Sequence, residues 1–395
     1  MTAPIAFNRP AMPDAAYRYL REAVANMHLS GDGPFTKRCH AALEAALGAP
    51  KVLLTTSCTH ALEMAALLLD VRPGDEVVVP SFTFVSTANA FALRGARIVF
   101  SDIRPDTLNL DERHLPGLLT RRTRAVVPVH YAGVACEMDA IGRAASAAGV
   151  AVVEDNAHGL FGTYRGRPLG SFGALAAQSF HETKNISCGE GGALVLNDPE
   201  LADRAEIIRE KGTNRSRFFR GEVDKYTWVD VGSSYLPSDA LAALLLAQLE
   251  MKAAIQARRR AVWDRYRTAL AGWAAEHRVG LPVVPDHCGH PAHLFYLLLP
   301  TLDDRQALLA HMKARGITAT FHYVPLHLSE MGARLGGRPG LCPVTEAVSD
   351  RLVRLPLFFD LTDADQDRVI GAVTAFRVPA GREPVADLLA RTAGG

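Results

Sequence analysis

The sequence predicts an α/β protein with a large domain, built on a mostly parallel central sheet flanked by helices, and a smaller C-terminal α/β domain. From about residue 36, short β-rich runs alternate with helical stretches. The runs are apolar at consecutive positions, which is typical of strands buried on both faces. Near Asp239 the alternation stops, so we expect a large domain of residues 1–250, including an N-terminal arm, and a small domain of residues 251–395.

The strands expected in the large domain are Val52–Leu54, Glu76–Val79, Ala96–Phe100, Ala125–Val129 and Val150–Val153. Helical patterns separate them, such as Thr59–Leu69 and Met138–Ala148. Because the carboxyl ends of parallel strands meet at one edge of the sheet, ligands bind there. The polar residues at or just after these expected ends are Thr56, Ser57, Ser81, His130, Asp155 and Ser179.

The second part of the chain begins with a long helical stretch from about Ser238 to Trp273, in which we expect an interruption or a bend. Isolated strands are expected at Leu294–Leu299 and Ile317–Tyr323, with helices between and after them. The stretch after about Val378 is rich in Ala, Gly, Arg and Pro, and we expect it to include a loosely held tail.

Composition excludes several classes of function. The 43 Lys and Arg residues balance 42 Asp and Glu residues, which argues against nucleic acid or a membrane surface as the main partner. We expect no membrane span, because no apolar run reaches about 18 residues, and no signal peptide at the N-terminus. The six cysteines are scattered and never form CxxC, so we expect free thiols and a cytoplasmic location.

Lys184 and Asp155 together predict a pyridoxal 5'-phosphate (PLP) site. Lys184 lies in a polar loop before the glycine run Gly189–Gly192, and Asp155 ends an apolar run about thirty residues upstream. A PLP enzyme needs an amine that links to the cofactor aldehyde and a carboxylate that keeps the pyridine nitrogen protonated. Alone, Lys184 would be read as a surface lysine and Asp155 as a turn cap, so the prediction depends on their context.

Neighbouring segments supply the other contacts that PLP requires. Ser57 and Thr59 stand where a strand joins a helix, and free N–H groups with hydroxyls there form an anion site for the phosphate. The same residues also suit a helix N-cap, and both roles can hold at once. Ser179 is a further hydroxyl donor, His158 can bond the phenolic oxygen of the cofactor, and Phe82 or Phe84 can stack on its ring.

Two other ligand classes are not expected. His181-Glu182 resembles the start of the zinc motif HExxH, but Asn185 replaces the second histidine. His287, Cys288, His290 and His293 lie in an irregular loop with no second cluster, so we predict no metal. No GxGxxG follows a strand, which argues against a dinucleotide enzyme.

In combination these segments resemble the DegT/DnrJ/EryC1/StrS family of PLP-dependent sugar aminotransferases, from about Pro10 to about Val373. Within the family, the greatest likeness is to the dTDP-4-amino-4,6-dideoxygalactose transaminases. The segments that carry this likeness are Gly31–Gly33 with Phe35-Thr36, Val52–Thr55 with Ser57–Thr59, Thr83–Ala90, Val129–Asp139, Phe180–Asn185 and Glu210–Ser216. The resemblance implies a fold-type-I PLP-dependent transferase that acts as a homodimer, with active sites at the subunit interface.

The resemblance also implies individual roles. Lys184 is the PLP-linked lysine and Asp155 the partner of the pyridine nitrogen, while Phe84 stacks on the ring. His158 stands where the family often has Gln, and a hydrogen-bond donor is retained there. The residues implied at the phosphate are Ser57, Cys58, Thr59, Ser179 and, where many members have Asn, Ser234 of the partner subunit. Those implied near the sugar nucleotide are Phe35, His322, Tyr323 and His327.

The implied reaction is transfer of an amino group from L-glutamate to C-4 of dTDP-4-keto-6-deoxy-D-glucose, which gives dTDP-4-amino-4,6-dideoxy-D-galactose. Family members that dehydrate sugars at C-3 carry histidine in place of the lysine, so Lys184 favours amino transfer. The alternatives that stay open are the gluco epimer at C-4 and a C-3 aminotransferase. From another class of protein, a PLP-binding regulatory or sensor protein without turnover is also an alternative.

Overall fold

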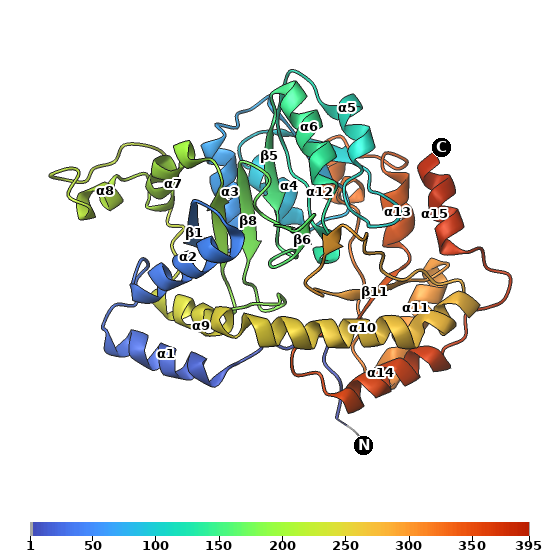
Figure 1. The fold of residues 1–395 in the computed structure, drawn as a ribbon. Coiled ribbons are helices and arrows are strands. Elements are labelled where there is room, and N and C mark those ends of the chain that lie inside the picture. The colour runs from blue at the N-terminus through green and yellow to red at the C-terminus, as the bar shows by residue number, and fades with distance from the viewer. Residues whose placement is uncertain (1–2, 395) are drawn as a thin grey trace.

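The computed structural model describes residues 3–394 and centres on a seven-stranded sheet covered by helices (Figure 1). The strand order is β1-β9-β8-β5-β4-β2-β3. Strand β9 is antiparallel to both of its neighbours, and the other four pairings are parallel. The mostly parallel α/β sheet expected from the sequence is therefore confirmed. The strands are β1 Lys51–Thr55, β2 Glu76–Pro80, β3 Arg97–Ser101, β4 Thr123–Val126, β5 Ala151–Asp155, β8 Leu175–Ser179 and β9 Gly192–Leu196.

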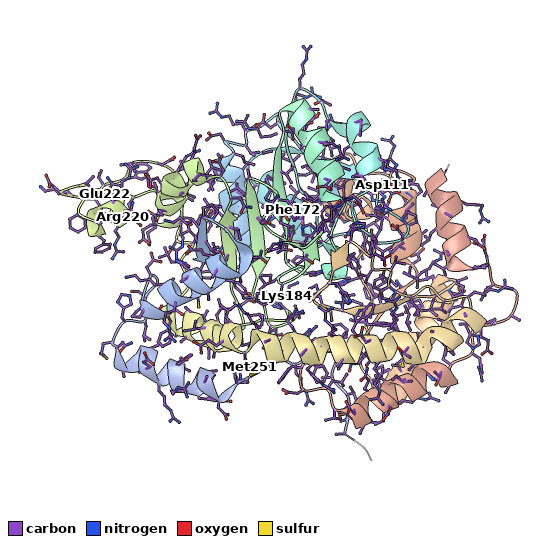
Figure 2. The ribbon with its side chains drawn as sticks, in the orientation of Figure 1. Asp111, Phe172, Lys184, Arg220, Glu222 and Met251 are labelled. Atoms are coloured by element: carbon purple, nitrogen blue, oxygen red, sulfur yellow. The ribbon has the colours of Figure 1, made fainter. Side chains whose placement is uncertain are left out.

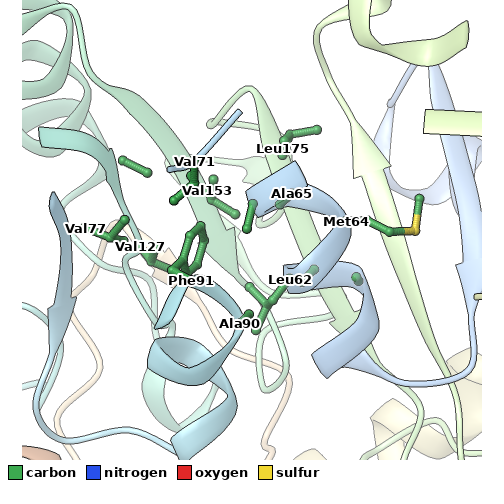
Figure 3. Close-up of a cluster of buried hydrophobic side chains, with 14 of the residues drawn as sticks. Leu62, Met64, Ala65, Val71, Val77, Ala90, Phe91, Val127, Val153 and Leu175 are labelled. Atoms are coloured by element: carbon green, nitrogen blue, oxygen red, sulfur yellow. The ribbon is translucent and has the colours of Figure 1, made fainter. Parts of the chain in front are cut away.

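Both faces of this sheet are apolar because alternate side chains of each strand enter different cores. In β2, Val77 and Val79 pack on one face, whereas Val78 packs on the other. The first face is covered by α3, α4 and α7, and Phe91 of α4 lies among the valines of neighbouring strands (Figure 3). These helices span Cys58–Leu68, Val85–Ala92 and Ala202–Arg209.

Two groups of helices cover the opposite face. At the β1 end, α2 (Pro34–Leu47) and α9 (Asp239–Glu250) pack on the sheet, with α1 (Asp14–Ala25) against α9. At the β3 end, α5 (Leu115–Leu118) and α6 (Met138–Ala148) complete the layer. Asp239 joins α9 to the start of α2, since its carboxylate accepts hydrogen bonds from the N–H groups of Phe35 and Thr36 at 3.2 and 2.8 Å.

A separate core lies under the C-terminal part of the chain. The long α10 (Lys252–Glu276) crosses the base of the molecule and packs against α14 (Asp363–Ala375), with α11 (Leu302–Ala314) beside it (Figure 1). The antiparallel strands β11 (Phe295–Leu298) and β12 (Leu352–Leu355) complete this core. A 64° bend at Met251 separates α10 from α9. We propose that the two domains divide there, as residues 1–250 and 251–395.

The remaining elements are short. Strands β10 (Cys288–Gly289), β6 (Thr163–Tyr164) and β7 (Arg167–Pro168) form a small sheet. Helix α8 (Arg215–Phe219) projects from the body beyond α7 (Figure 1). Helices α12 (Glu330–Arg334) and α13 (Pro343–Ser349) follow the loop after α11. The 3-10 turns are η1 Glu112–His114, η2 Tyr131–Gly133, η3 Pro199–Leu201 and η4 Leu326–Leu328.

Three local predictions were wrong. Residues 317–323 make only isolated bridges, Ile5 with Ile317 and Thr320 with Arg354, because the segment turns toward the sheet instead of pairing along its length. Strand β4 ends at Val126 rather than Val129. The expected loose tail contains α15 (Val385–Gly394), which packs on α13 through buried residues four positions apart, Val385 and Leu389.

Among residues 3–394, no single helix is long and apolar enough to cross a membrane. In this described part of the chain, only α9 and α10 taken together reach that length and composition, and the 64° bend lies between them. All six cysteines are free, as the sequence predicts.

Candidate active site

A cavity of about 840 Å³ opens at the carboxyl ends of the parallel strands and extends to the small domain. Its volume lies within the range of small-molecule sites. The large domain contributes one wall, which includes the end of β5 and the starts of α3 and α4, and the small domain contributes the other. The predicted residues that line the cavity are Ser57, Cys58, Thr59, Phe84, Asp155, His158, Ser179, Lys184, His322 and Tyr323.

Lys184 lies in the loop that joins the antiparallel strands β8 and β9 (Figure 2). The loop is closed by hydrogen bonds from the N–H groups of Phe180 to the Gly191 carbonyl and of Glu182 to the Gly189 carbonyl, both 2.8 Å. Although the residue as a whole is half-buried, its amine is desolvated, and this burial lowers the pKa of Lys184 to about 8. The neutral fraction at pH 7 rises to about a tenth, far above that of a solvated lysine, and the neutral amine is a nucleophile and a base.

Asp155 is the last residue of β5 and is buried with 5% exposure. Its Oδ2 accepts a hydrogen bond of 2.7 Å from the Thr87 hydroxyl of α4, and its Oδ1 accepts one of 3.2 Å from the Ala157 N–H. Burial raises the pKa of Asp155, and these hydrogen bonds oppose the rise. A buried carboxylate without an ion-pair partner among residues 3–394 suits a cationic ring nitrogen, which would supply the missing charge.

The start of α3 forms an anion cradle. Ser57 caps the helix, its Oγ accepting from the His60 N–H at 3.1 Å, and the Thr59 hydroxyl bonds that of Ser86 at 2.7 Å. A Cβ on Gly192 would lie 2.3 Å from the Ser57 carbonyl carbon, so only glycine lets β9 approach this turn. Ser179, at the end of β8, lines the same part of the cavity.

His158 lines the cavity and has an unsatisfied polar atom. Its Nδ1 is buried with no hydrogen-bond partner in the part of the chain that the structure describes. Burial lowers the pKa of His158 well below its usual value, and the charges of Lys184 and Arg354 lower it further. A neutral imidazole with a free polar atom fits the phenolic oxygen of PLP. Phe84, 58% exposed, lines the cavity where a ring could stack. The residues present therefore fit PLP.

His322 and Tyr323 form the opposite wall. Their rings stack with centroids 3.7 Å apart, and the Tyr131 hydroxyl lies 3.1 Å from the Nδ1 of His322. Burial lowers the pKa of His322 well below its usual value, so the ring is neutral. In the tautomer whose Nδ1 accepts from the Tyr131 hydroxyl, the neutral ring carries its proton on Nε2, which is then a donor.

Three predicted site residues lie outside the cavity lining. Phe35 is fully buried in α2 against Tyr19, with ring centroids 5.4 Å apart. His327 is also fully buried, with its Nδ1 2.6 Å from the Ser81 hydroxyl and its Nε2 2.9 Å from the Glu346 carboxylate. Ser234 is exposed and bridges to Glu210 on the same chain. Phe35 and His327 are enclosed by protein atoms, so we expect them to support the site without touching the substrate.

Sequence reasoning missed several lining residues. His293 belongs to the cluster dismissed as a metal site; its ring stacks on His158 at 4.2 Å, and its Nδ1 lies 2.9 Å from the Asn185 Oδ1. The other two histidines of that cluster separate, since His290 packs on Trp263 and His287 bonds Glu137. Phe7 and Arg354 also line the cavity, but no local sequence pattern marks them as site residues. No group of three or more possible metal ligands occurs within residues 3–394.

The comparisons with known proteins agree with this geometry. The chain matches the DegT/DnrJ/EryC1/StrS aminotransferase family over residues 11–374. It is similar to the aminotransferase TlmJ from Streptoalloteichus hindustanus, with 33% identity and a TM-score of 0.87 over 94% of this chain and 98% of that one. It is also similar to S. venezuelae DesV, with 32% identity and a TM-score of 0.84 over 96% of this chain and 100% of that one.

A third similar structure bears on the cofactor. Spr1654 from Streptococcus pneumoniae, assigned as a sugar aminotransferase, has been solved in a PLP form and a PMP (pyridoxamine phosphate) form. The PLP form is 26% identical, with a TM-score of 0.86 over 98% of this chain and 99% of that one. The family match spans most of the sequence and accords with the fold-type-I sheet and the PLP-compatible cavity. This chain belongs to the DegT/DnrJ/EryC1/StrS aminotransferase family and is a PLP-dependent sugar aminotransferase.

Proposed function

We propose that the protein transfers the amino group of L-glutamate to C-4 of dTDP-4-keto-6-deoxy-D-glucose and forms dTDP-4-amino-4,6-dideoxy-D-galactose. The placement of Lys184 carries the proposal, since its amine lines the cavity and has its pKa lowered to about 8. The choice of C-4 is supported by the segments that resemble the C-4 transaminases, among them Thr83–Ala90 and Val129–Asp139.

We assign the cofactor contacts to the large-domain wall. Lys184 would link to the cofactor, Asp155 would pair with its ring nitrogen, and Phe84 would stack on the ring. His158 would bond the phenolic oxygen, and the residues that would hold the phosphate are Ser57, Cys58, Thr59 and Ser179. When bound, PLP carries the amino group between the two half-reactions and withdraws electrons from the carbon that loses its proton.

In this proposal Lys184 moves the protons. Its neutral amine removes the α-proton of the amino donor and later delivers a proton to C-4 of the sugar. The face of C-4 that meets Lys184 decides between the galacto and gluco products. Thr87 holds Asp155 in place by its 2.7 Å hydrogen bond, so the ring nitrogen keeps its counter-charge throughout.

The substrate lies against the small-domain wall. The Nε2–H of His322 and the hydroxyl of Tyr323 are donors suited to sugar oxygens, and both side chains line the cavity. Because Tyr131 fixes the orientation of His322 through the 3.1 Å contact at Nδ1, the donor is preorganised.

We propose that the protein acts as a homodimer in which Ser234 of the partner subunit reaches the cofactor phosphate. Ser234 lies outside the cavity of its own chain and is exposed, as a residue that acts on a second copy must be. The nearby Trp228, Val229 and Val231 are also exposed, at 76%, 50% and 50%, and give this region an apolar surface suited to an interface.

The cytoplasm is the proposed compartment. Six free cysteines persist where thiols are kept reduced.

Product analysis tests the proposed reaction directly. The protein would be incubated with PLP, L-glutamate and dTDP-4-keto-6-deoxy-D-glucose, and the product would be characterised by NMR. The proposal predicts an axial amino group at C-4, the galacto configuration. An equatorial amine would identify the gluco epimer. Reaction only with a 3-keto sugar nucleotide would identify a C-3 aminotransferase, and either outcome would overturn the assignment.

A further inference from the structure

Asn185, the residue after Lys184, makes its side-chain hydrogen bonds across the boundary between the two proposed domains. Its Nδ2 donates to the Pro291 carbonyl at 2.7 Å and to the Gln256 Oε1 at 3.2 Å. Its Oδ1 lies 2.9 Å from the Nδ1 of His293. Gln256 belongs to α10, and Pro291 and His293 lie between β10 and β11. The small domain therefore binds both polar atoms of the Asn185 amide.

These contacts fix the position of the proton on His293. A carbonyl oxygen can only accept, so the Asn185 atom beside the Pro291 carbonyl is the amide nitrogen, and the atom beside His293 is the amide oxygen. Because the amide oxygen also only accepts, the Nδ1 of His293 carries a proton and donates it. Burial lowers the pKa of His293 well below its usual value, so the ring is neutral and its Nε2 is unprotonated.

The backbone at His293 is held by α10. The buried Arg259 donates from its Nε to the Ala292 carbonyl at 3.2 Å and from its Nη2 to the His293 carbonyl at 2.6 Å. Ala292 has a φ of 51°, a left-handed conformation that a residue with a Cβ rarely adopts. Such a conformation persists where the surroundings impose it, and Arg259 supplies that constraint. The imidazole of His293 is therefore presented from a rigid support.

The His293 ring also contacts the large domain at a second place. It stacks on His158, with the centroids 4.2 Å apart and the planes 27° apart. Both rings line the cavity, as does Lys184. Residues 180–191, the loop that carries Lys184, connect β8 to β9. One small-domain side chain thus contacts both the residue next to Lys184 and the ring of His158.

We propose that Asn185 and His293 form a clamp between the domains that holds the Lys184 loop in place, so that both are positioning residues for the Lys184 amine. Because consecutive Cα atoms are about 3.8 Å apart, a fixed Asn185 limits how far Lys184 can move. A displacement of about 1 Å can slow a reaction about 100-fold. This inference rests on the proposed role of Lys184, but not on the identity of the sugar.

The tautomer of His293 can be measured without any reaction. Full-length PLP-loaded protein with isotopically labelled histidine would be studied by nitrogen–proton NMR, and the loss of one set of signals in His293→Phe would identify His293. We expect the neutral form with the proton on Nδ1. Asn185→Ala, which removes the acceptor, should shift these signals. A proton on Nε2, or signals that Asn185→Ala leaves unchanged, would contradict the clamp.

Two substitutions separate the hydrogen bond of His293 from its ring. His293→Asn keeps a donor near the position of Nδ1, whereas His293→Phe keeps a ring that can stack on His158 but cannot donate. PLP capture by cofactor-free protein should slow about 10- to 100-fold in His293→Phe, the scale of a small displacement, and stay near wild type in His293→Asn. The reverse order would show that the ring carries the effect, and it would overturn the clamp.

The pH profile of PLP capture provides a readout that general loss of stability does not move. In the wild type the rate should level off above the pKa of Lys184, which is lowered to about 8 by burial. A displaced amine is better solvated, so this pH should rise in His293→Phe and return in His293→Asn. A profile that His293→Phe leaves in place would contradict the clamp.

The clamp also predicts that its two residues act through one hydrogen bond. Asn185→Ala combined with His293→Phe should slow capture much less than the product of the two single effects. His287→Phe is the control, since His287 bonds Glu137 at 3.0 Å and does not line the cavity, so capture should not change. An equal loss in His287→Phe, or effects that multiply in the double variant, would overturn the proposal.

The role of Lys184 and the clamp can fail separately. Borohydride reduction of the PLP form, followed by peptide mass spectrometry, identifies the residue linked to the cofactor. Attachment to a residue other than Lys184 would refute the proposed function. Attachment to Lys184 at a rate that His293→Phe does not change would refute the clamp alone.

Discussion

The two walls of the cavity differ in how their polar groups are satisfied. On the large-domain wall, Asp155 and the α3 cradle are held by hydrogen bonds within their own domain, such as Thr87 to Asp155 at 2.7 Å. On the small-domain wall, Arg354 keeps an unpaired Nε and His293 stacks across the boundary on His158. The first wall fixes its carboxylate and its anion cradle through its own hydrogen bonds, whereas the second wall carries a guanidinium that has no anionic partner in the part of the chain that the structure describes.

Removal of Lys184 should have the largest effect. Lys184→Ala lacks both the linking amine and the proton carrier, so we expect transamination to fall at least about 10⁴-fold. Release of 2-oxoglutarate from glutamate measures it. Lys313→Ala, an exposed lysine of α11, is the control and should keep full activity. Appreciable turnover in Lys184→Ala would refute the assignment.

Asp155→Asn should be the next most damaging change. The amide keeps the shape but removes the charge that faces the ring nitrogen, so the donor half-reaction should slow about 10²- to 10³-fold, as when one preorganised electrostatic group is lost. Stopped-flow absorbance measures the rate. Asp155→Glu retains the charge and should recover part of the loss. A rate within a factor of two of wild type would show that this wall does not hold the ring nitrogen.

The pH dependence of PLP capture tests whether the Lys184 amine on the large-domain wall is desolvated. Only the neutral amine attacks an aldehyde, and the pKa of Lys184 is lowered to about 8. In cofactor-free protein, the rate constant for PLP capture should rise about tenfold per pH unit below that value and level off above it. Absorbance traces at saturating PLP give this profile. A rise that continues past pH 10 would mean that the amine is solvated.

The smallest effect is expected at Thr87. Thr87→Val removes one hydrogen bond to Asp155, a loss of about 1 kcal/mol that corresponds to roughly fivefold in the donor half-reaction. Thr87→Ser keeps the hydroxyl and should react like the wild type. Equal rates for the valine and serine variants would show that Asp155 needs no support from α4.

The same contrast explains what could be predicted from the sequence. Ser57, Asp155 and Ser179 end apolar runs, and parallel strands bring such ends together, so local pattern and topology suffice. Arg354 and Phe7 enter the cavity only because β12 and the N-terminal segment pack around the small-domain core, and neither carries a local signal. His293 was visible but misread, since its cluster separates in three dimensions. Residues 385–394 form a helix that buries Val385 and Leu389 on one face. The Ala- and Arg-rich composition of this stretch does not reveal that these two apolar residues pack together.

The difference between the two walls is tested most directly by measuring the affinity for PLP in one variant from each wall. PLP would be titrated into cofactor-free Asp155→Asn and Arg354→Met, with binding followed by fluorescence. We predict that Asp155→Asn raises the dissociation constant about 10- to 100-fold, as expected for a lost charged hydrogen bond. Arg354→Met should match the wild type. Weakened PLP binding in Arg354→Met, or wild-type affinity in Asp155→Asn, would contradict the account.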